Sequence, residues 1–196
     1  MDAVANSPMP HSAIDMPSSW VRRFAPLIPV GEVLDLACGS GRHSRLLASL
    51  GHPVLALDRN AESLAQAAGA GITTLQHDLE SADEAARWPF APRRFAGVVV
   101  TNYLFRPLLL SIVDSVAPGG VLIYETFAAG NAEFGKPSNP EFLLAHGELL
   151  ALAQQYGLHV LAYEDGYADT PKPAMVQRLC AIKARAPFLA ENLRLS

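Results

Sequence analysis

Two glycines and a carboxylate stand where they could hold a nucleotide-like ligand. Gly39 and Gly41 form a tight turn directly after the apolar run 33–37. Glycines let a ligand approach the backbone, and the first amides of a helix that follows such a turn face the ligand. Asp58 ends the next apolar run, about 20 residues on, where a carboxylate can accept hydrogen bonds from ribose hydroxyls. The spacing predicts a site for an adenosine-type cofactor.

The glycine turn matches the dinucleotide fingerprint G-x-G-x-x-G only in part. Gly39 and Gly41 supply the first two glycines, but Ser44 occupies the third position. The third glycine normally permits close packing of the helix on the strand. A carboxylate at Asp58 suits any cofactor with a ribose, so it does not by itself choose between a dinucleotide and a smaller ligand.

Strand-like and helix-like segments alternate along the chain and must position this turn. Strands are predicted at 33–37, 53–58, 72–76, 95–101, 121–125, 158–164 and 175–183. Helices are predicted at 17–24, 42–50, 61–69, 82–88, from 107 onward, and at 146–156, and Ala117–Gly120 is expected to be a turn. Such alternation predicts a mostly parallel α/β sheet with helices on both faces. The last two strands have no helix between them and must pair as an antiparallel hairpin.

Length and composition indicate one folded domain. The chain has 196 residues, of which 50% are hydrophobic and 17% charged, enough apolar material for a substantial core. We expect a single domain over residues 17–186, with a flexible arm at residues 1–16 and a tail at residues 187–196.

Charge, cysteine content and hydropathy indicate the cellular compartment and the classes of partner. The net charge of −4 argues against a nucleic-acid surface, which is usually basic. Cys38 and Cys180 stand far apart and are expected to be free thiols in a reducing compartment, and no His/Cys cluster has metal-ligand spacing. The N-terminus shows no signal-peptide pattern, and no apolar run is long enough for a bilayer. We expect a cytoplasmic protein with no metal, nucleic-acid or membrane partner; monomer and dimer both stay open.

Five segments in register resemble the motifs of class I S-adenosylmethionine-dependent methyltransferases. They are Val33–Gly41 (motif I), Asp58 (the acidic end of the second strand), His77–Leu79 (the adenine-side motif), Val98–Phe105 (the motif after the fourth strand) and Ala117–Gly120. With the terminal hairpin, they cover roughly residues 17–183. The chain is also similar to small bacterial methyltransferases of the tellurite-resistance and thiopurine type. The resemblance implies a Rossmann-like, doubly wound sheet of seven strands in the order 3-2-1-4-5-7-6.

The resemblance also implies S-adenosylmethionine as the cofactor and a set of residues that bind it. These are Asp35, Ala37, Gly39, Gly41, Asp58, Arg59, Asp78, Leu79, Asn102 and Tyr103. The glycine turn would line the methionine part, Asp58 would bind the ribose, and Asp78 would bind the adenine amino group. Asn102 and Tyr103 would lie beside the sulfonium, which an aromatic face attracts as it attracts an ammonium. A purely structural role stays open for Asp35, as a partner of nearby backbone amides, and for Asp58 and Asp78, as helix N-terminal carboxylates.

The methyl acceptor is expected to be a small molecule bound at the carboxyl ends of the strands. Candidate segments are the N-terminal segment with Trp20, the turn 102–106, and the loop 127–140 with Lys136. Tyr103, Lys136 and His146 are the candidates for a catalytic group. The Asn102-Tyr103-Leu104 turn lacks the Pro-Pro of methyltransferases that act on adenine or glutamine amino groups, which argues against a nucleic-acid acceptor.

Two other functions stay open from the sequence. A methyltransferase-like module without catalysis would serve to bind a partner, and the retained Asp35, Gly39, Gly41 and Asp58 argue against it. A nicotinamide-dependent oxidoreductase would use the same glycine turn, and Ser44 and the terminal hairpin argue against that alternative.

Overall fold

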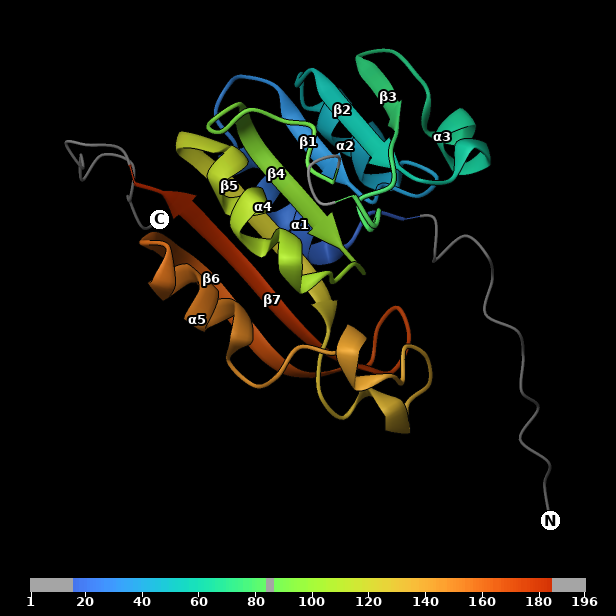
Figure 1. Cartoon of the computed structure of the whole chain (residues 1–196), viewed down its shortest axis with the longest axis vertical. Helices are drawn as coiled ribbons and strands as arrows, with labels where there is room; N and C mark the ends of the chain where they lie inside the picture. The colour runs from blue at the N-terminus through green and yellow to red at the C-terminus, as the bar shows by residue number, and fades with distance from the viewer. Residues whose placement is uncertain (1–15, 84–86, 185–196) are drawn as a thin grey trace.

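The computed structural model describes residues 16–83 and 87–184, which form one sheet with helices on both faces (Figure 1). The strands are β1 (Val33–Leu36), β2 (Val54–Asp58), β3 (Ile72–Gln76), β4 (Phe95–Thr101), β5 (Val116–Phe127), β6 (Leu158–Ala168) and β7 (Ala174–Lys183). The α-helices are α1 (Ser19–Phe24), α2 (Arg42–Ser49), α3 (Ala61–Ala67), α4 (Leu109–Ser115) and α5 (Glu148–Gln155). The predicted arm and tail lie almost wholly outside the described residues, and the predicted helix 82–88 does so in part.

The sheet has the predicted topology. Its seven strands run in the order β3-β2-β1-β4-β5-β7-β6. The strands β1 to β5 pair in parallel, whereas β7 is antiparallel to both β5 and β6. Every residue of β4 is buried, as expected for a central strand that is covered on both faces and carries a Val98–Val100 run. The strand β4 therefore occupies the middle of the molecule and ends at the site described below.

Helices cover the two faces of the sheet in separate groups. The helices α1 and α2 bury Trp20, Val21 and Leu47 against one face. The helices α4 and α5 bury Ile112 and Leu149 against the other face. Trp20 is 3% exposed, and its indole N–H donates to the Leu179 carbonyl at 3.3 Å. Because Trp20 is a core residue, it offers no surface to an acceptor, and α1 is a packing helix capped by Ser18.

The sequence predicts a separate turn at Ala117–Gly120, but in the structure these residues are part of β5. Phe95 of β4 pairs with Val116, but Gly97 pairs with Val121, so the β5 backbone bulges between these pairs. Gly119 has a φ of +84°, and a Cβ on Gly120 would lie 2.8 Å from the Ala96 carbonyl oxygen. The glycines permit the bulge, which the sequence signals in the same way as an open turn.

Within residues 16–83 and 87–184, no helix combines the length and the apolar composition that a membrane span requires. The same residues contain no group of three or more His, Cys, Asp or Glu side chains arranged to hold a metal ion.

Candidate functional site

A cleft opens at the carboxyl ends of the parallel strands. Ligands of open α/β sheets bind at this edge, where the strand order reverses. The reversal lies between β1 and β4, because β1 pairs with β2 on its other side. The lining residues follow four strands in turn: Ala37 after β1; Leu57, Asp58 and Arg59 at β2; His77, Asp78, Leu79 and Glu80 after β3; and Tyr103 after β4. The predicted residues Asp35, Gly39, Gly41 and Asn102 lie outside this lining.

Asp58 joins the cleft to the glycine turn. Its Oδ2 accepts a hydrogen bond from the Gly39 amide at 2.8 Å, and its Oδ1 accepts one from the Asn60 amide at 2.9 Å. The helix α3 is capped by the Asn60 side chain, which accepts from the Ser63 amide, so Asp58 is not a helix cap. A carboxylate offers about four acceptor positions. Asp58 therefore retains capacity for donors that enter the cleft.

The chain turns sharply where β1 and β4 end. Ala37 and Asn102 each have a φ of +54°, in the left-handed region that residues other than glycine rarely adopt. The Asn102 amide donates to the Glu125 carbonyl at 2.9 Å and thereby fixes the second of these bends. Such conformations cost of order 1–3 kcal/mol each and cluster at functional sites. Two of them stand on neighbouring strands at the mouth of the cleft.

The two glycines of the turn have different roles. A Cβ on Gly39 would meet nothing within 4 Å, so its face of the turn is open. A Cβ on Gly41 would lie 2.5 Å from the Ala67 Cβ and 2.7 Å from the Ala67 Cα. Gly41 thus allows α3 to approach the turn closely and serves packing, whereas Gly39 leaves space for a ligand.

Asp35 lies beneath the turn and not in the cleft. It is fully buried, and its Oδ2 accepts a hydrogen bond from the Ser44 hydroxyl. Burial raises the pKa of Asp35 to about 6, although the bond from Ser44 acts in the opposite direction. Its Oδ1 has no hydrogen-bond partner among the described residues. Ser44, at the third-glycine position, therefore holds α2 against β1 through Asp35.

Tyr103 lies on the side of the cleft formed by the residues after β3. Its hydroxyl is buried and has no hydrogen-bond partner within the described ranges. Burial, followed by the carboxylates of Glu80 and Asp78, raises the pKa of Tyr103. Tyr103 therefore stays protonated at neutral pH and can donate a hydrogen bond, but it cannot act as a base. The structure places it with Asp78, at the predicted adenine end.

His43 is the centre of a buried polar cluster beside the cleft, which sequence reasoning did not find. Its Nε2 accepts from the Ser18 amide at 3.1 Å, so the ring proton is on Nδ1, which donates to the Thr101 hydroxyl at 3.2 Å. Burial lowers the pKa of His43 to about 3. His43 is thus a neutral connector between α1, α2 and the end of β4, with both ring nitrogens in use.

Glu125 of β5 continues this cluster across the sheet. Its Oε2 accepts from the Ser18 hydroxyl at 3.0 Å and from Arg178 Nε at 2.7 Å. Arg178 also donates to Glu164 at 2.8 Å, which joins β5, β7 and β6. The sequence signal for Glu125 is the same as for Asp58, a carboxylate that ends an apolar run.

The other two catalytic candidates lie away from the cleft. Lys136 is exposed in the loop between β5 and α5. The side chain of His146 is 74% exposed, and its Nδ1 lies 3.2 Å from Asp165 Oδ2. Neither residue lines the cleft.

Comparisons with known proteins agree with this geometry. Residues 33–120 match the family model of a methyltransferase domain. The matched segment is a little under half of the 196-residue chain, and the seven-stranded sheet has the Rossmann-like fold of the methyltransferases. No curated protein matches the chain. The chain resembles TehB from Haemophilus influenzae, with a TM-score of 0.67 and 22% identity over 83% of the chain, but it spans only 61% of that protein.

Two further solved structures show how widely the fold is shared. A SAM-dependent methyltransferase from Methanosarcina mazei has a TM-score of 0.63 and 16% identity, covering 86% of this chain and 99% of that one. The [4+2]-cyclase SpnF has a TM-score of 0.61 and 16% identity, covering 83% of this chain and 80% of its own. At such identities the likeness shows the fold alone.

The residues of the cleft fit S-adenosylmethionine, the cofactor that the methyltransferase-domain match implies. Asp58 has spare acceptor capacity for ribose hydroxyls, and Gly39 leaves an open face beside it. The buried Tyr103 hydroxyl, beside Glu80, is a further donor on this side of the cleft. These residues suit a ligand with a ribose and hydrogen-bond acceptors.

Proposed function

We propose that this chain binds S-adenosylmethionine in the cleft and transfers its methyl group to a small-molecule acceptor. The observation that carries the proposal is the Asp58 carboxylate at the carboxyl end of β2, one strand away from the strand-order reversal, where it accepts a hydrogen bond from the Gly39 amide at 2.8 Å. A carboxylate at this place accepts hydrogen bonds from ribose hydroxyls. The same position on an open α/β sheet suits an adenosine-type cofactor and a ligand close to the glycine turn.

The proposed contacts follow the strands. Asp58 and Arg59 bind the ribose, and Asp78, Leu79 and Tyr103 surround the adenine. The backbone of Ala37, Gly39 and Gly41 lines the methionine part, with Asp35 holding the turn from below and Asn102 shaping the edge of β4. The sequence predicts Tyr103 beside the sulfonium. We instead propose that it contacts the adenine, because its hydroxyl lies among Glu80, Asp78 and Arg59.

The chain's contribution to the reaction is alignment and exclusion of water. The bound cofactor supplies an activated methyl group for in-line displacement. Holding the acceptor in line with that group can lower the barrier by ~7–11 kcal/mol. A dedicated base is needed only for an acceptor that must lose a proton. Burial raises the pKa of Tyr103, and His43 has a pKa of about 3 with both nitrogens occupied, so neither is proposed as a base.

Isothermal titration with S-adenosylmethionine, S-adenosylhomocysteine and NAD tests the binding step. We expect the two sulfur ligands to bind and NAD not to bind. Asp58→Ala should weaken binding on the order of 100-fold, because charge-assisted hydrogen bonds are lost. Asp114→Ala is the matched control, since Asp114 is a half-exposed carboxylate at the other edge of the sheet. Absence of binding at millimolar ligand would refute the proposal.

A screen with labelled cofactor and a metabolite panel tests the transfer step. Transfer to one acceptor class supports the proposal and identifies the substrate. Binding of the cofactor without transfer to any acceptor supports the non-catalytic module instead, and binding of NAD alone supports the oxidoreductase. The SpnF fold likeness makes this second experiment necessary, because a protein named as a cyclase shares the same architecture.

A further inference from the structure

Arg106 stands at the junction between the cleft and the long loop, which we define as residues 128–147. It begins a short 3-10 helix (Arg106–Leu108), three residues after the cleft residue Tyr103. The long loop lies beyond the carboxyl end of β5, at the same edge of the sheet as the cleft (Figure 1). Under the proposed function, this loop is a segment from which acceptor contacts are expected.

The Arg106 guanidinium makes four hydrogen bonds to the long loop and the start of α5. Nε and Nη2 donate to the two carboxylate oxygens of Glu148 at 2.8 and 2.9 Å, as a bidentate pair. Nη1 donates to the Glu141 carbonyl at 2.7 Å, and Nη2 to the Leu143 carbonyl at 2.8 Å. Only a planar fork of N–H groups satisfies these acceptors together, and a lysine cannot replace it.

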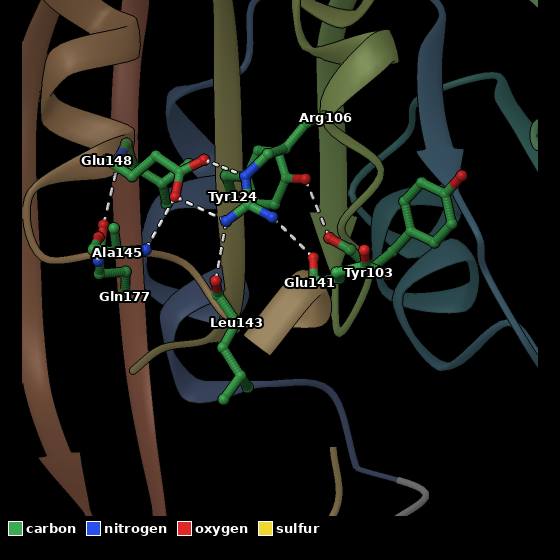
Figure 2. Close-up of polar contacts among 9 residues, drawn as sticks. Tyr103, Arg106, Tyr124, Glu141, Leu143, Ala145, Glu148 and Gln177 are labelled. Atoms are coloured by element: carbon green, nitrogen blue, oxygen red, sulfur yellow. Dashed lines mark hydrogen bonds and ion pairs between the residues drawn. The ribbon is translucent and has the colours of Figure 1, made fainter. Parts of the chain in front are cut away.

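The acceptors are themselves fixed from a second side (Figure 2). Glu148 Oε2 also accepts from the Ala145 amide at 2.8 Å. Gln177 of β7 donates to the Ala145 carbonyl and accepts from the Leu149 amide at 3.1 Å. The second half of the long loop is therefore held between Arg106 and β7.

The turn that carries Tyr103 is fixed by the same group of residues. Tyr124 is fully buried, and its hydroxyl donates to the Tyr103 carbonyl at 2.9 Å. Figure 2 shows Tyr124 beside Arg106, while the ring of Tyr103 points away from this network, on the side where it lines the cleft. A shift of the Tyr103 backbone and a shift of the long loop must both disturb residues 103–106.

A second bidentate pair of the chain provides a contrast. Arg94 donates from Nε and Nη2 to Glu32 at 2.9 and 3.0 Å, and its side chain is 40% exposed against 41% for Arg106. Among the described residues, the hydrogen bonds of Arg94 go to Glu32 alone. The two arginines match in bidentate geometry and in exposure. Arg94 also lies over the Phe90 and Phe95 rings, at 5.4 and 4.9 Å, whereas Arg106 binds loop carbonyls.

We propose that Arg106 is a positioning residue that couples the cleft to the long loop. A ligand that binds in the cleft then also orders the second half of this loop, from which acceptor contacts are expected. This inference rests on the proposed function for its meaning in catalysis, but its physical content is a coupling between two segments. No residue from 139 to 148 lines the cleft, so any response of that segment to a cleft ligand must pass through such a connection.

Hydrogen exchange with mass spectrometry on the full chain tests the coupling, with S-adenosylhomocysteine as the probe. In the natural protein, we expect the ligand to slow exchange in segments 102–108 and 139–148. In Arg106→Lys, exchange in 139–148 should rise without ligand, the ligand-induced protection of that segment should fall at least threefold, and the dissociation constant should rise three- to tenfold. Arg94→Lys is the control and should behave as the natural protein does.

A merely structural role for Arg106 gives a different result. It would lower the melting temperature of Arg106→Lys yet leave the ligand-induced protection of 139–148 intact, which overturns the proposal. Protection confined to 102–108 in the natural protein overturns it as well. If Arg106→Lys does not fold, Glu148→Gln removes the ion pair but keeps the two carbonyl bonds, and a partial loss of the same protection is expected.

Failure of the proposed function can be told apart from failure of this inference. If the natural protein binds no S-adenosylhomocysteine, the proposed function fails, and the ligand-free arm decides the coupling. Faster exchange in 102–108 together with 139–148 in Arg106→Lys then supports a joint unit. Faster exchange in 139–148 alone overturns it.

Discussion

The two edges of the sheet use similar residues for different purposes. Each edge has a bidentate arginine–glutamate pair, Arg94–Glu32 at the amino ends of β1 and β4 and Arg106–Glu148 at the carboxyl side. The pair Arg94–Glu32 joins two side chains at the surface. Arg106 also binds the Glu141 and Leu143 carbonyls and so shapes a loop. The charge of an ion pair does not by itself organise a site. The pair does so when the other N–H groups of the arginine donate to backbone carbonyls.

Glycines with positive φ show the same contrast. Gly51, in the turn after α2, has a φ of +90° and nothing within 4 Å of a Cβ. Gly41, at the carboxyl edge, has a φ of +78° and contacts Ala67 closely. Gly51 therefore serves conformation alone, whereas Gly41 serves both conformation and space.

The largest expected effect is that of Gly41→Ala on stability. The new Cβ would lie 2.5 Å from the Ala67 Cβ, so α3 must move in addition to the cost of a left-handed alanine. We expect a loss of about 3 kcal/mol in unfolding free energy. Gly51→Ala, the matched control, should lose only about 1 kcal/mol. Urea unfolding measures both, and equal losses in the two variants would remove the distinction between the edges.

Two buried groups at the carboxyl edge predict opposite dependences of stability on pH. The pKa of His43 is about 3 in the folded protein against an ordinary 6.5, so acidification from pH 6.5 favours the unfolded state, which binds the proton. The pKa of Asp35 is about 6 against 3.8, so acidification from pH 6 favours the folded state. Between pH 6 and 3.8 the two contributions oppose each other.

Two variants separate these contributions. Asp35→Asn should lose stability with falling pH, and His43→Gln should gain it, each by up to about 1.4 kcal/mol per pH unit relative to the natural protein. Urea unfolding at several values from pH 6 to pH 4 measures the slopes. Arg94→Lys, which changes the amino edge only, should keep the natural slope. If the unfolding free energy of Asp35→Asn changes with pH as steeply as that of the natural protein, the raised pKa of the buried Asp35 carboxyl is contradicted.

Gly39→Ala should separate ligand binding from stability. Its φ of +54° predicts a stability cost of about 1 kcal/mol, as for Gly51→Ala, because neither Cβ meets another atom within 4 Å. The added methyl group projects from the glycine turn next to Asp58, where the cofactor is proposed to approach. We expect affinity for S-adenosylhomocysteine to fall about tenfold or more, about 1.4 kcal/mol. If calorimetry shows an unchanged affinity for S-adenosylhomocysteine, the open face of Gly39 contacts only solvent and not the ligand.

The smallest expected effect is that of Arg94→Lys. An exposed ion pair contributes about 0–1 kcal/mol, and lysine retains the charge, so the change in unfolding free energy should stay within about 0.5 kcal/mol. Thermal unfolding detects a larger effect readily. A loss comparable with that of Arg106→Lys would mean that the two pairs are equivalent.

Local patterns in the sequence were sufficient to predict most of the fold. The segments 72–76 and 95–101 are strands with the predicted ends, because alternation and turn residues report local conformation. The strand order followed from the family resemblance. The prediction of a turn at Ala117–Gly120 was wrong, because a glycine-rich bulge inside a strand and a turn before a strand have the same composition.

The site was predictable only where its residues follow strands. Asp58, Asp78 and Tyr103 reach one cleft because parallel strands end together. Asp35 belongs to the motif Val33–Gly41 but points beneath the turn, and Gly41 faces Ala67. The residue types in the motif do not indicate either direction. The bond from Arg106 to Glu148 spans 42 positions, and no local pattern indicates which carboxylate an arginine will meet.

The long loop is attached almost entirely through main-chain atoms. Arg106 binds the Glu141 and Leu143 carbonyls, and Gln177 binds the Ala145 carbonyl. Asn131 donates to the Pro137 carbonyl and accepts from the Met175 amide. Every amino acid supplies a carbonyl, so the exposed side chains of this loop can be exchanged while its course persists, whereas the buried Asn131 and Leu144 cannot. Under the proposed function, the loop is therefore a frame on which new acceptor preferences can evolve without a new fold.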